Sequence, residues 1–309
     1  MIRSMSAPSP VKAARVISAH GRLAWIMAPD EAPQVAGLKG RALQVFTNDR
    51  VAVDYGIRPP QILSVEPRRN RLYREEGPRE KTLAANVDGV LILLAGHPGF
   101  SPDLTLRVMS SLMNQRIPLT LVVNKWDRVA DHARTERLLE SIQPVDSSAH
   151  WPCVRISCHA PGGLQPLLEH LKTWPPGRTR SIALAGQSGM GKSSLLNALV
   201  PDADAQTQAV SEALQSGRHT TTASRGYAWG SDWIIDTPGF QRFGITHIEA
   251  QDLLAVFPEW AQLAPEGCRY PNCRHDHEPH CRVRLACETN PLLEARRQAW
   301  LSLLSGTQG

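Results

Sequence analysis

The sequence predicts a multidomain α/β protein, and three observations carry this prediction. Residues 14–66 read as short strands broken by turn residues, which is typical of a small β-barrel. From about residue 80, continuous apolar runs alternate with helical segments, as in a parallel sheet with helices on both faces. Near the C-terminus, three cysteines and a histidine lie within fourteen residues. We therefore expect a flexible tail at 1–13, a barrel at 14–78, a sheet domain at 79–245 and a helical metal-binding domain at 246–309.

The 309 residues carry a formal net charge of +5, and this excess lies in residues 1–80, which hold 13 Lys and Arg against 8 Asp and Glu. A basic N-terminal module indicates a polyanionic partner, first of all a nucleic acid, although a basic surface that serves only solubility has the same composition.

Six cysteines, three of them close to histidines, favour a metal site in the reducing cytoplasm over a disulfide framework. No apolar run approaches the roughly 20 residues of a membrane span, so we expect a cytoplasmic protein with no membrane partner.

Five short strands are expected in the basic N-terminal part, and they suit a barrel of the oligonucleotide-binding (OB) type. The expected strands are Ala14–Ser18, Arg22–Met27, Ala42–Phe46, Arg50–Asp54 and Gln61–Val65. A basic stretch with one aromatic residue follows them. Its arginines would contact phosphates and its tyrosine would stack on a base, although a solvated linker fits the same stretch. The predicted RNA-binding residues are Arg68, Arg69, Arg71, Tyr73 and Arg74.

The sheet domain is expected from apolar runs that suit strands buried on both faces. These runs are Val87–Ala95, Leu119–Val123, Val154–Ser157, the segment that starts at Ser181, and Trp233–Ile235. Helical segments separate the first four runs, at Leu104–Met113, Arg134–Ile142 and Gly163–Leu171. Strands that alternate with helices in this way form a parallel sheet.

A phosphate-binding loop is predicted directly after the strand at Ser181. The stretch Gly186-Gln187-Ser188-Gly189-Met190-Gly191-Lys192-Ser193 fits the pattern G-x-x-x-x-G-K-[ST], with a strand before it and a helix after it. The glycines let backbone N–H groups face a phosphate chain, and the helix N-terminus adds partial positive charge. Lys192 would reach the β- and γ-phosphates, and Ser193 would hold Mg²⁺. We assign this loop and the following Ser194 to nucleotide binding.

A guanine-reading motif, N-K-x-D, ends the second apolar run as Asn124-Lys125-Trp126-Asp127. The Asp127 carboxylate can accept hydrogen bonds from guanine N1–H and N2–H₂, whereas adenine would leave it unpaired, so GTP is expected rather than ATP. Asn124 would face guanine N7 and O6, and Lys125 would lie along the base plane. The third run ends in Ser157-Cys158, where a main-chain N–H would support guanine O6.

Two segments after the phosphate loop are expected to respond to the γ-phosphate. The first is Gly217–Thr222, in which Thr221 would close on Mg²⁺, with Thr222 as the alternative. The second is the D-x-x-G stretch from Asp236 to Gly239, in which Asp236 would hold the Mg²⁺ shell through water and the N–H of Gly239 would sense the phosphate. The expected magnesium residues are therefore Ser193, Thr221 and Asp236.

Phe240 stands where Ras-like enzymes carry the glutamine that orients the attacking water. A phenylalanine cannot do this, so either hydrolysis is slow or another group orients the water. His219 in the first switch is the nearest candidate in sequence, although an exposed loop histidine without a catalytic role would look the same. The expected catalytic residues are His219, Lys192 and Thr221.

The motifs occur in a permuted order. The guanine motifs at 124 and 157 precede the phosphate loop, whereas an ordinary GTPase runs from phosphate loop to D-x-x-G to N-K-x-D. The same sheet can form if the chain starts before the Val87 strand and is rejoined near 174–177, the stretch Trp-Pro-Pro-Gly. The sequence therefore predicts a circularly permuted P-loop GTPase domain whose second switch leads directly into the C-terminal region.

The cysteine cluster has the spacing C-x₄-C-x-H-x₅-C, formed by Cys268, Cys273, His275 and Cys281. Three thiolates and one imidazole complete a tetrahedral zinc site, which predicts one structural zinc ion per chain. His277, His280 and Cys287 lie close by but are not needed as ligands. Flanking helices are expected at Gln251–Phe257 and Pro291–Leu304. In the second helix, the expected apolar face carries Ala295, Ala299 and Leu303, and Arg296 and Arg297 lie on the opposite face.

Together these features resemble the bacterial ribosome small-subunit biogenesis GTPases, the RsgA (YjeQ) family. GQSGMGKSSLLNAL, GRHTTT, DTPGF and Glu278-Pro279-x-Cys281 are similar to its motifs, and the resemblance covers about residues 14–305. Cys158, Trp126 and Arg128 depart from its pattern. The resemblance implies a cytoplasmic GTPase that binds the small (30S) ribosomal subunit and its rRNA late in assembly, and that hydrolyses GTP to GDP faster there. It also implies release of maturation factors and a site that tolerates or uses K⁺; we expect a monomer.

Two other functions stay open at this point. Phe240 leaves room for an RNA-binding scaffold in which GTP is only a structural ligand. The basic barrel also fits a GTP-gated regulator of another nucleic acid.

Overall fold

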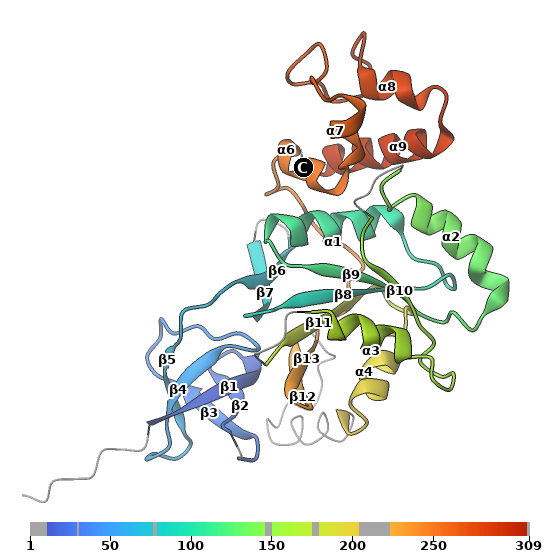
Figure 1. Ribbon diagram of the computed structural model, residues 1–309. Coiled ribbons are helices and arrows are strands. Elements are labelled where there is room, and N and C mark those ends of the chain that lie inside the picture. Colours follow the sequence, from blue (N-terminus) through green and yellow to red (C-terminus); the bar gives the residue numbers. More distant parts are fainter. Residues whose placement is uncertain are drawn as a thin grey trace, which may run out of the picture.

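The computed structural model describes residues 11–29, 31–76, 79–145, 150–174, 179–203 and 223–307. Figure 1 shows the barrel at one end, the main sheet in the middle and the C-terminal helices at the other end. Among the residues described, no helix has the length and apolar character needed to cross a membrane. The predicted first switch, with His219, Thr221 and Thr222, and most of the joint at 174–177 lie outside the described residues.

Five strands close the predicted N-terminal barrel. They are β1 (Val11–His20), β2 (Leu23–Met27), β3 (Gln34–Leu38), β4 (Arg50–Asp54) and β5 (Gln61–Val65), in the order β1-β2-β3-β5-β4. β1 also pairs with β4, and β3 runs parallel to β5. Alternate residues such as Val51, Val53 and Ile62 point into a small separate core. The five-stranded barrel predicted from the sequence is therefore confirmed.

The third strand of the barrel differs from the prediction. The expected strand Ala42–Phe46 is a loop, and the strand lies earlier, at Gln34–Leu38. The Arg22 guanidinium donates to the carbonyl of Leu38 at the end of β3 (2.6 Å) and to the carbonyl of Leu43 in the loop (3.3 Å). Val45 is nevertheless buried, which explains why the loop looked like a strand in the sequence.

The main sheet has six strands in the order β10-β9-β8-β11-β13-β12. They are β8 (Gly89–Leu94), β9 (Leu119–Val123), β10 (Cys153–Arg155), β11 (Ser181–Gly186), β12 (Arg225–Trp229) and β13 (Asp232–Asp236). All pairs are parallel except β12 with β13, and β12 adds an edge strand to those predicted. Every residue of β8, β9 and β11 is buried, as expected for strands covered on both faces.

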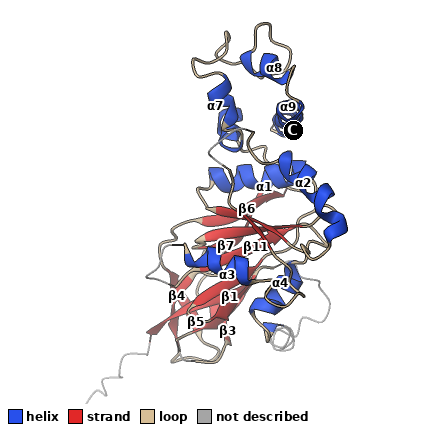
Figure 2. Ribbon diagram, turned by 45° about the vertical axis from the view of Figure 1, so that its right-hand side comes forward, coloured by secondary structure: helices blue, strands red, loops and turns tan. Residues whose placement is uncertain are grey.

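Helices cover both faces of this sheet. Figures 1 and 2 show α1 (Pro102–Asn114) and α2 (His132–Glu140, preceded by the 3₁₀ turn η1, Val129–Asp131) on one face. They show α3 (Gln165–Lys172) and α4 (Lys192–Leu199) on the other. The strand that precedes the phosphate loop, β11, lies at the centre of the sheet although it comes late in the chain. The parallel sheet and the permuted strand order predicted from the sequence are thus confirmed.

A hairpin of β6 (Arg71–Glu76) and β7 (Arg79–Ala85) links the barrel to the sheet. Leu72 and Leu83 of the hairpin belong to the large core of the sheet domain rather than to the barrel core. The Glu75 carboxylate accepts a hydrogen bond from the backbone N–H of Thr246 (2.8 Å). The hairpin therefore holds the segment that leads from the second switch into the C-terminal helices.

The C-terminal region contains α6 (Ala250–Leu253), the 3₁₀ turn η2 (Leu254–Val256), α7 (Glu259–Leu263), α8 (Arg282–Cys287) and α9 (Pro291–Gly306). The helix predicted at Gln251–Phe257 is thus a short α-helix that tightens into a 3₁₀ turn. Helix α9 packs against α1, which places the C-terminal helices on the sheet domain.

The predicted faces of α9 are wrong except at Leu303, which is buried. The buried residues are Leu293, Arg296, Trp300, Leu303 and Leu304, whereas Ala295 is exposed and Ala299 is half-buried. Arg296 can be buried because hydrogen-bond acceptors lie next to it in the protein interior. Its guanidinium donates to Glu259 Oε1 (2.6 Å) and to the carbonyl of Val256 (2.6 Å). A charged residue with such partners can replace an apolar one on the inner face of a helix.

Candidate functional site

The phosphate loop joins β11 to α4, and two of its glycines have left-handed backbones, with φ of 82° at Gly189 and 92° at Gly191. At Gly191 a side chain would also lack space, because a Cβ there would lie 2.1 Å from Asn124 Nδ2. That same amide donates to the carbonyl of Met190 (3.1 Å). Glycine at 191 therefore allows the loop to close against the end of β9.

The N-K-x-D motif follows β9 and contacts the phosphate loop through hydrogen bonds. Lys125 Nζ donates to the carbonyl of Gly189 (2.8 Å), and Asn124 Oδ1 accepts from the N–H of Cys158 (3.3 Å). The N–H of Asp127 donates to Ser157 Oγ (2.8 Å), while the side chain of Asp127 is exposed. Asn124 thus links three motifs that lie far apart in the sequence. Burial raises the pKa of the Cys158 thiol to about 11, so this neighbour of the site is uncharged at neutral pH.

The D-x-x-G stretch lies on the other side of the phosphate loop. Lys192 and Asp236 form an ion pair, and the N–H of Phe240 donates to the carbonyl of Gly186 (3.3 Å). Thr237 Oγ1 donates to the carbonyl of Leu184 (2.7 Å), which fixes the stretch to β11. The structure therefore brings the predicted lysine, aspartate and glycine loop together at the ends of adjacent parallel strands.

Phe240 is almost fully buried, and its ring packs against Phe243 with centroids 5.9 Å apart. Its side chain is held in the apolar core rather than directed to solvent. This position contributes packing and offers no polar group to a water molecule.

Gln187 has a contact that sequence reasoning missed. Its Oε1 accepts from the N–H of Ser101 (3.2 Å), and its Nε2 donates to the carbonyl of the same residue (3.3 Å). Ser101 caps the N-terminus of α1, and the first turn of α1 carries Asp103, which accepts from Ser302 Oγ of α9 (2.7 Å). The phosphate loop and the C-terminal helices therefore contact the same end of α1. The Ser-Pro-Asp start of α1 signals a helix cap in the sequence, but it does not reveal this partner.

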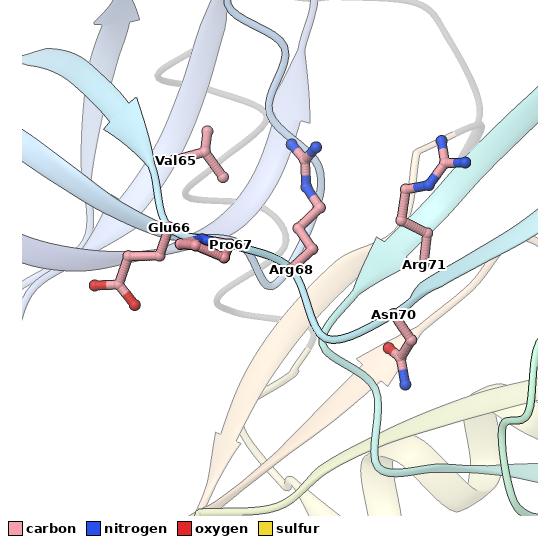
Figure 3. A pocket seen from close by; sticks show the side chains of 6 residues that line it. All are labelled: Val65, Glu66, Pro67, Arg68, Asn70 and Arg71. Carbon is pink, nitrogen blue, oxygen red and sulfur yellow. The ribbon is translucent and has the colours of Figure 1, made fainter.

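The basic stretch after β5 forms a strap between barrel and sheet domain. Arg68 donates to both oxygens of the buried Asp49 (2.8 and 2.9 Å), and Arg69 pairs with Asp88 (2.9 Å). Figure 3 shows the side chains of Arg68 and Arg71 on one side of this strap. The strap lines a hollow of about 490 Å³, formed by Val65, Glu66, Pro67, Arg68, Asn70 and Arg71.

The outer part of the predicted RNA-binding stretch lies on β6. Arg71 faces Glu80 at 3.5 Å in a pair in which both side chains are about half exposed, and its guanidinium lies 5.8 Å from the centroid of the Tyr73 ring. Tyr73 also lies against His247, with ring centroids 5.5 Å apart. The predicted arginines therefore fall into an inner pair that holds buried or nearly buried acids and an outer group on the hairpin.

The predicted metal ligands converge. One ligand atom from each of Cys268, Cys273, His275 and Cys281 lies within 4.8 Å of the others. The Cys268 and Cys281 sulfurs are 3.9 Å apart, and His275 Nδ1 lies 3.7 and 3.4 Å from them. A tetrahedral zinc ion with Zn–S bonds of about 2.3 Å needs sulfurs about 3.8 Å apart, so these residues fit the ion. The group could therefore hold a metal ion.

Side chains other than the four candidate ligands hold the loop that carries them. Glu278 accepts from the N–H groups of Arg274 (2.7 Å) and Asp276 (2.9 Å). Trp300 Nε1 of α9 donates to the carbonyl of Arg274 (2.7 Å). Such contacts orient metal ligands and are typical of an ordered metal centre.

Comparison with known proteins gives one family. Residues 65–246 match the family model described as RsgA GTPase. The small ribosomal subunit biogenesis GTPase RsgA of Ralstonia pickettii is 36% identical over 299 residues, which cover 94% of this chain and 91% of that protein. The protein of the same name from Bordetella pertussis is 37% identical over 295 residues, 94% of either chain.

Solved structures show the same fold. The crystal structure of YjeQ from Thermotoga maritima superposes with a TM-score of 0.69 at 25% identity, covering 97% of this chain and 99% of that one. YloQ, described as a circularly permuted GTPase, superposes with a TM-score of 0.60 at 19% identity, covering 99% and 98% of the two chains.

Proposed function

The chain belongs to the RsgA family of small ribosomal subunit biogenesis GTPases, and from this premise we propose that it binds the 30S subunit and hydrolyses GTP to GDP and phosphate faster when bound there. One observation supports the proposal above all others. Asn124 of the guanine motif contacts the carbonyl of Met190 in the phosphate loop and the N–H of Cys158, although these motifs occur in permuted order. A site that joins base and phosphate recognition in this way suits a guanine nucleotide.

We assign the nucleotide contacts as follows. The loop from Gly186 to Ser194 would cradle the phosphates with its N–H groups, and Lys192 would turn from Asp236 to the β- and γ-phosphates. Ser193, Thr221 and Asp236 would hold Mg²⁺, which neutralises charge on the phosphates when bound. Gly239 would sense the γ-phosphate, and His219 is the candidate to orient the attacking water. Asn124, Lys125, Asp127, Ser157 and Cys158 would surround the guanine, and K⁺ could assist at the phosphates.

The remaining assignments concern zinc and RNA. We propose that Cys268, Cys273, His275 and Cys281 hold one structural zinc ion per chain, because four ligands leave no open position for chemistry.

We propose that Arg71, Tyr73 and Arg74 provide the rRNA contact of the strap. Arg68 and Arg69 would support it, since they already pair with Asp49 and Asp88. The exposed pair of Arg71 and Glu80 stabilises little and is easily exchanged for a phosphate. We expect the protein to act as a monomer in the cytoplasm.

GTP turnover tests the proposed function directly. We expect slow hydrolysis by the protein alone and faster hydrolysis with purified 30S subunits, measured as released phosphate at saturating GTP. Large subunits at the same concentration serve as the control and should not stimulate. Equal slow turnover in all three conditions would contradict the proposal and would favour an RNA-binding scaffold, which the buried Phe240 makes a reasonable second candidate.

Replacing Asp127 by asparagine should exchange the base preference. The amide offers a donor where guanine N2–H₂ also donates, so GTP affinity should fall about 100-fold, while xanthosine triphosphate, which has a carbonyl there, should bind better. Competition binding with both nucleotides gives the measurement. Asp131→Asn, a change at the nearby η1, is the matched control and should leave both affinities unchanged. Unaltered GTP affinity in Asp127→Asn would show that the guanine pocket is assigned wrongly.

A further inference from the structure

The tryptophan inside the N-K-x-D motif lies between two side chains. The Trp126 ring stacks on His132, with centroids 3.9 Å apart and an interplanar angle of 11°. The Arg155 guanidinium lies 4.9 Å from the centroid of the same indole. Arg155 comes from the end of β10, and His132 is the first residue of α2. The indole is therefore held by the two elements on either side of the base-reading loop.

The backbone of Trp126 is fixed as well. Its N–H donates to the carbonyl of Ile156 (3.0 Å), and its carbonyl, which can only accept, lies 2.7 Å from His132 Nε2. His132 therefore carries a proton on Nε2 and contacts residue 126 through both its ring face and its ring edge. The next N–H, that of Asp127, donates to Ser157 Oγ (2.8 Å). These contacts leave the peptide between Trp126 and Asp127 little freedom to rotate.

The supporting side chains are themselves held in place. Arg155 forms an ion pair with Glu136 of α2 (2.7 Å), so β10 and α2 are joined over the indole. Beyond the indole, the side chain of Asp127 is exposed. An exposed carboxylate that must bind a base in one orientation gains most from a fixed backbone.

We propose that Trp126 is a positioning residue for guanine recognition, holding Asp127 in the orientation that pairs with guanine N1–H and N2–H₂. Trp126 itself does not touch the base in this proposal; it acts through the backbone of Asp127. The inference rests on the proposed GTP binding at this site. It predicts that loss of the stack weakens the contact to the guanine amino group more than it weakens nucleotide binding as a whole.

The test compares GTP with ITP, whose base lacks the 2-amino group, in binding titrations of Trp126→Ala. The unmodified protein should prefer GTP by about 10- to 100-fold, the range of one hydrogen bond to a charged group. In Trp126→Ala this preference should fall to about threefold or less. Trp126→Phe keeps an aromatic ring between His132 and Arg155 and should retain most of the preference, and His132→Ala, which removes one side of the stack, should lie between the two.

Trp151→Ala is the matched control, because it removes another half-buried tryptophan from the same domain, away from the motif. It should leave the GTP-to-ITP ratio unchanged even if stability falls. Equal losses of GTP and ITP affinity in both Trp126→Ala and His132→Ala, with an unchanged ratio, would overturn the inference. If Trp126→Ala does not fold, the His132→Ala ratio decides alone. A ratio near one in the unmodified protein would instead contradict the proposed guanine site itself.

Discussion

Replacing Cys281 by serine should abolish binding of the proposed zinc ion and unfold the C-terminal loop that contains its four ligands. Cys281 is buried, and its sulfur lies 3.4 Å from His275 Nδ1 and 3.9 Å from the Cys268 sulfur. The described residues 264–280 contain no helix or strand, so a metal ion would supply most of the order in this segment. Zinc in small structural sites contributes about 10–16 kcal/mol at neutral pH, far more than any other single interaction in this region.

Metal content and thermal unfolding measure this effect. The unmodified protein should contain one zinc ion per chain, and Cys281→Ser should contain close to none and lose its C-terminal unfolding transition. Cys287→Ser is the matched control, because Cys287 is a buried cysteine one helix further on that lies outside the ligand group. A full complement of zinc in Cys281→Ser would show that the four ligands are assigned wrongly. Treatment of the unmodified protein with a chelator should reproduce the effect of the substitution.

The motifs of this protein were predictable because their chemistry demands particular residues at particular spacings. A phosphate loop needs glycines before a lysine, and a zinc site needs four soft ligands in reach of one ion. Permutation leaves such motifs recognisable, since each motif is local, and the sheet then brings motifs from distant parts of the chain together. Asn124 and Gly191 illustrate this, because their close contact follows from the adjacency of strand ends rather than from any sequence signal.

The wrong predictions concern places where a side chain bonds to backbone carbonyls or to a charged group that is distant in the sequence. Arg22 donates to the carbonyls of Leu38 and Leu43, and the sequence does not reveal this contact with the loop that follows β3. The strap after β5 shows the same limit. Its arginines looked equivalent, yet Arg68 holds the buried Asp49 while Arg71 remains about half exposed. The sequence shows that these residues are basic, but it does not show with which acidic residue each one forms an ion pair.

In helix α9, an ion pair with a residue distant in the sequence decides which face of the helix is buried, rather than the spacing of its apolar residues. Arg296 was expected on the face opposite Leu303, yet neither it nor Glu259 has appreciable exposed side-chain area. The guanidinium donates to Glu259, to the carbonyl of Val256 and to the carbonyl of Ile142 (3.2 Å), and it lies 4.3 Å from the centroid of the Phe257 ring. Burial lowers the pKa of Arg296, but an arginine stays protonated at neutral pH. Because Ile142 follows α2, this one side chain joins the C-terminal helices to the sheet domain.

Replacing Arg296 by methionine should therefore lower the free energy of unfolding by about 3–5 kcal/mol, the usual cost of leaving one partner of a buried ion pair alone. Urea unfolding followed by tryptophan fluorescence measures the change. Arg282→Met is the matched control, because its pair with Glu266 is exposed and should contribute no more than about 1 kcal/mol.

A double variant separates the lost charge from the lost packing. Arg296→Met combined with Glu259→Met removes both charges and should be more stable than Arg296→Met alone, because no buried carboxylate is then left without its partner. If the double variant is no more stable than the single one, the unpaired carboxylate is not the source of the loss, and the cost lies in the packing over Phe257 and the bonds to Val256 and Ile142, which both variants lose. A change of less than about 1 kcal/mol in Arg296→Met would show that Arg296 does not hold the two domains together.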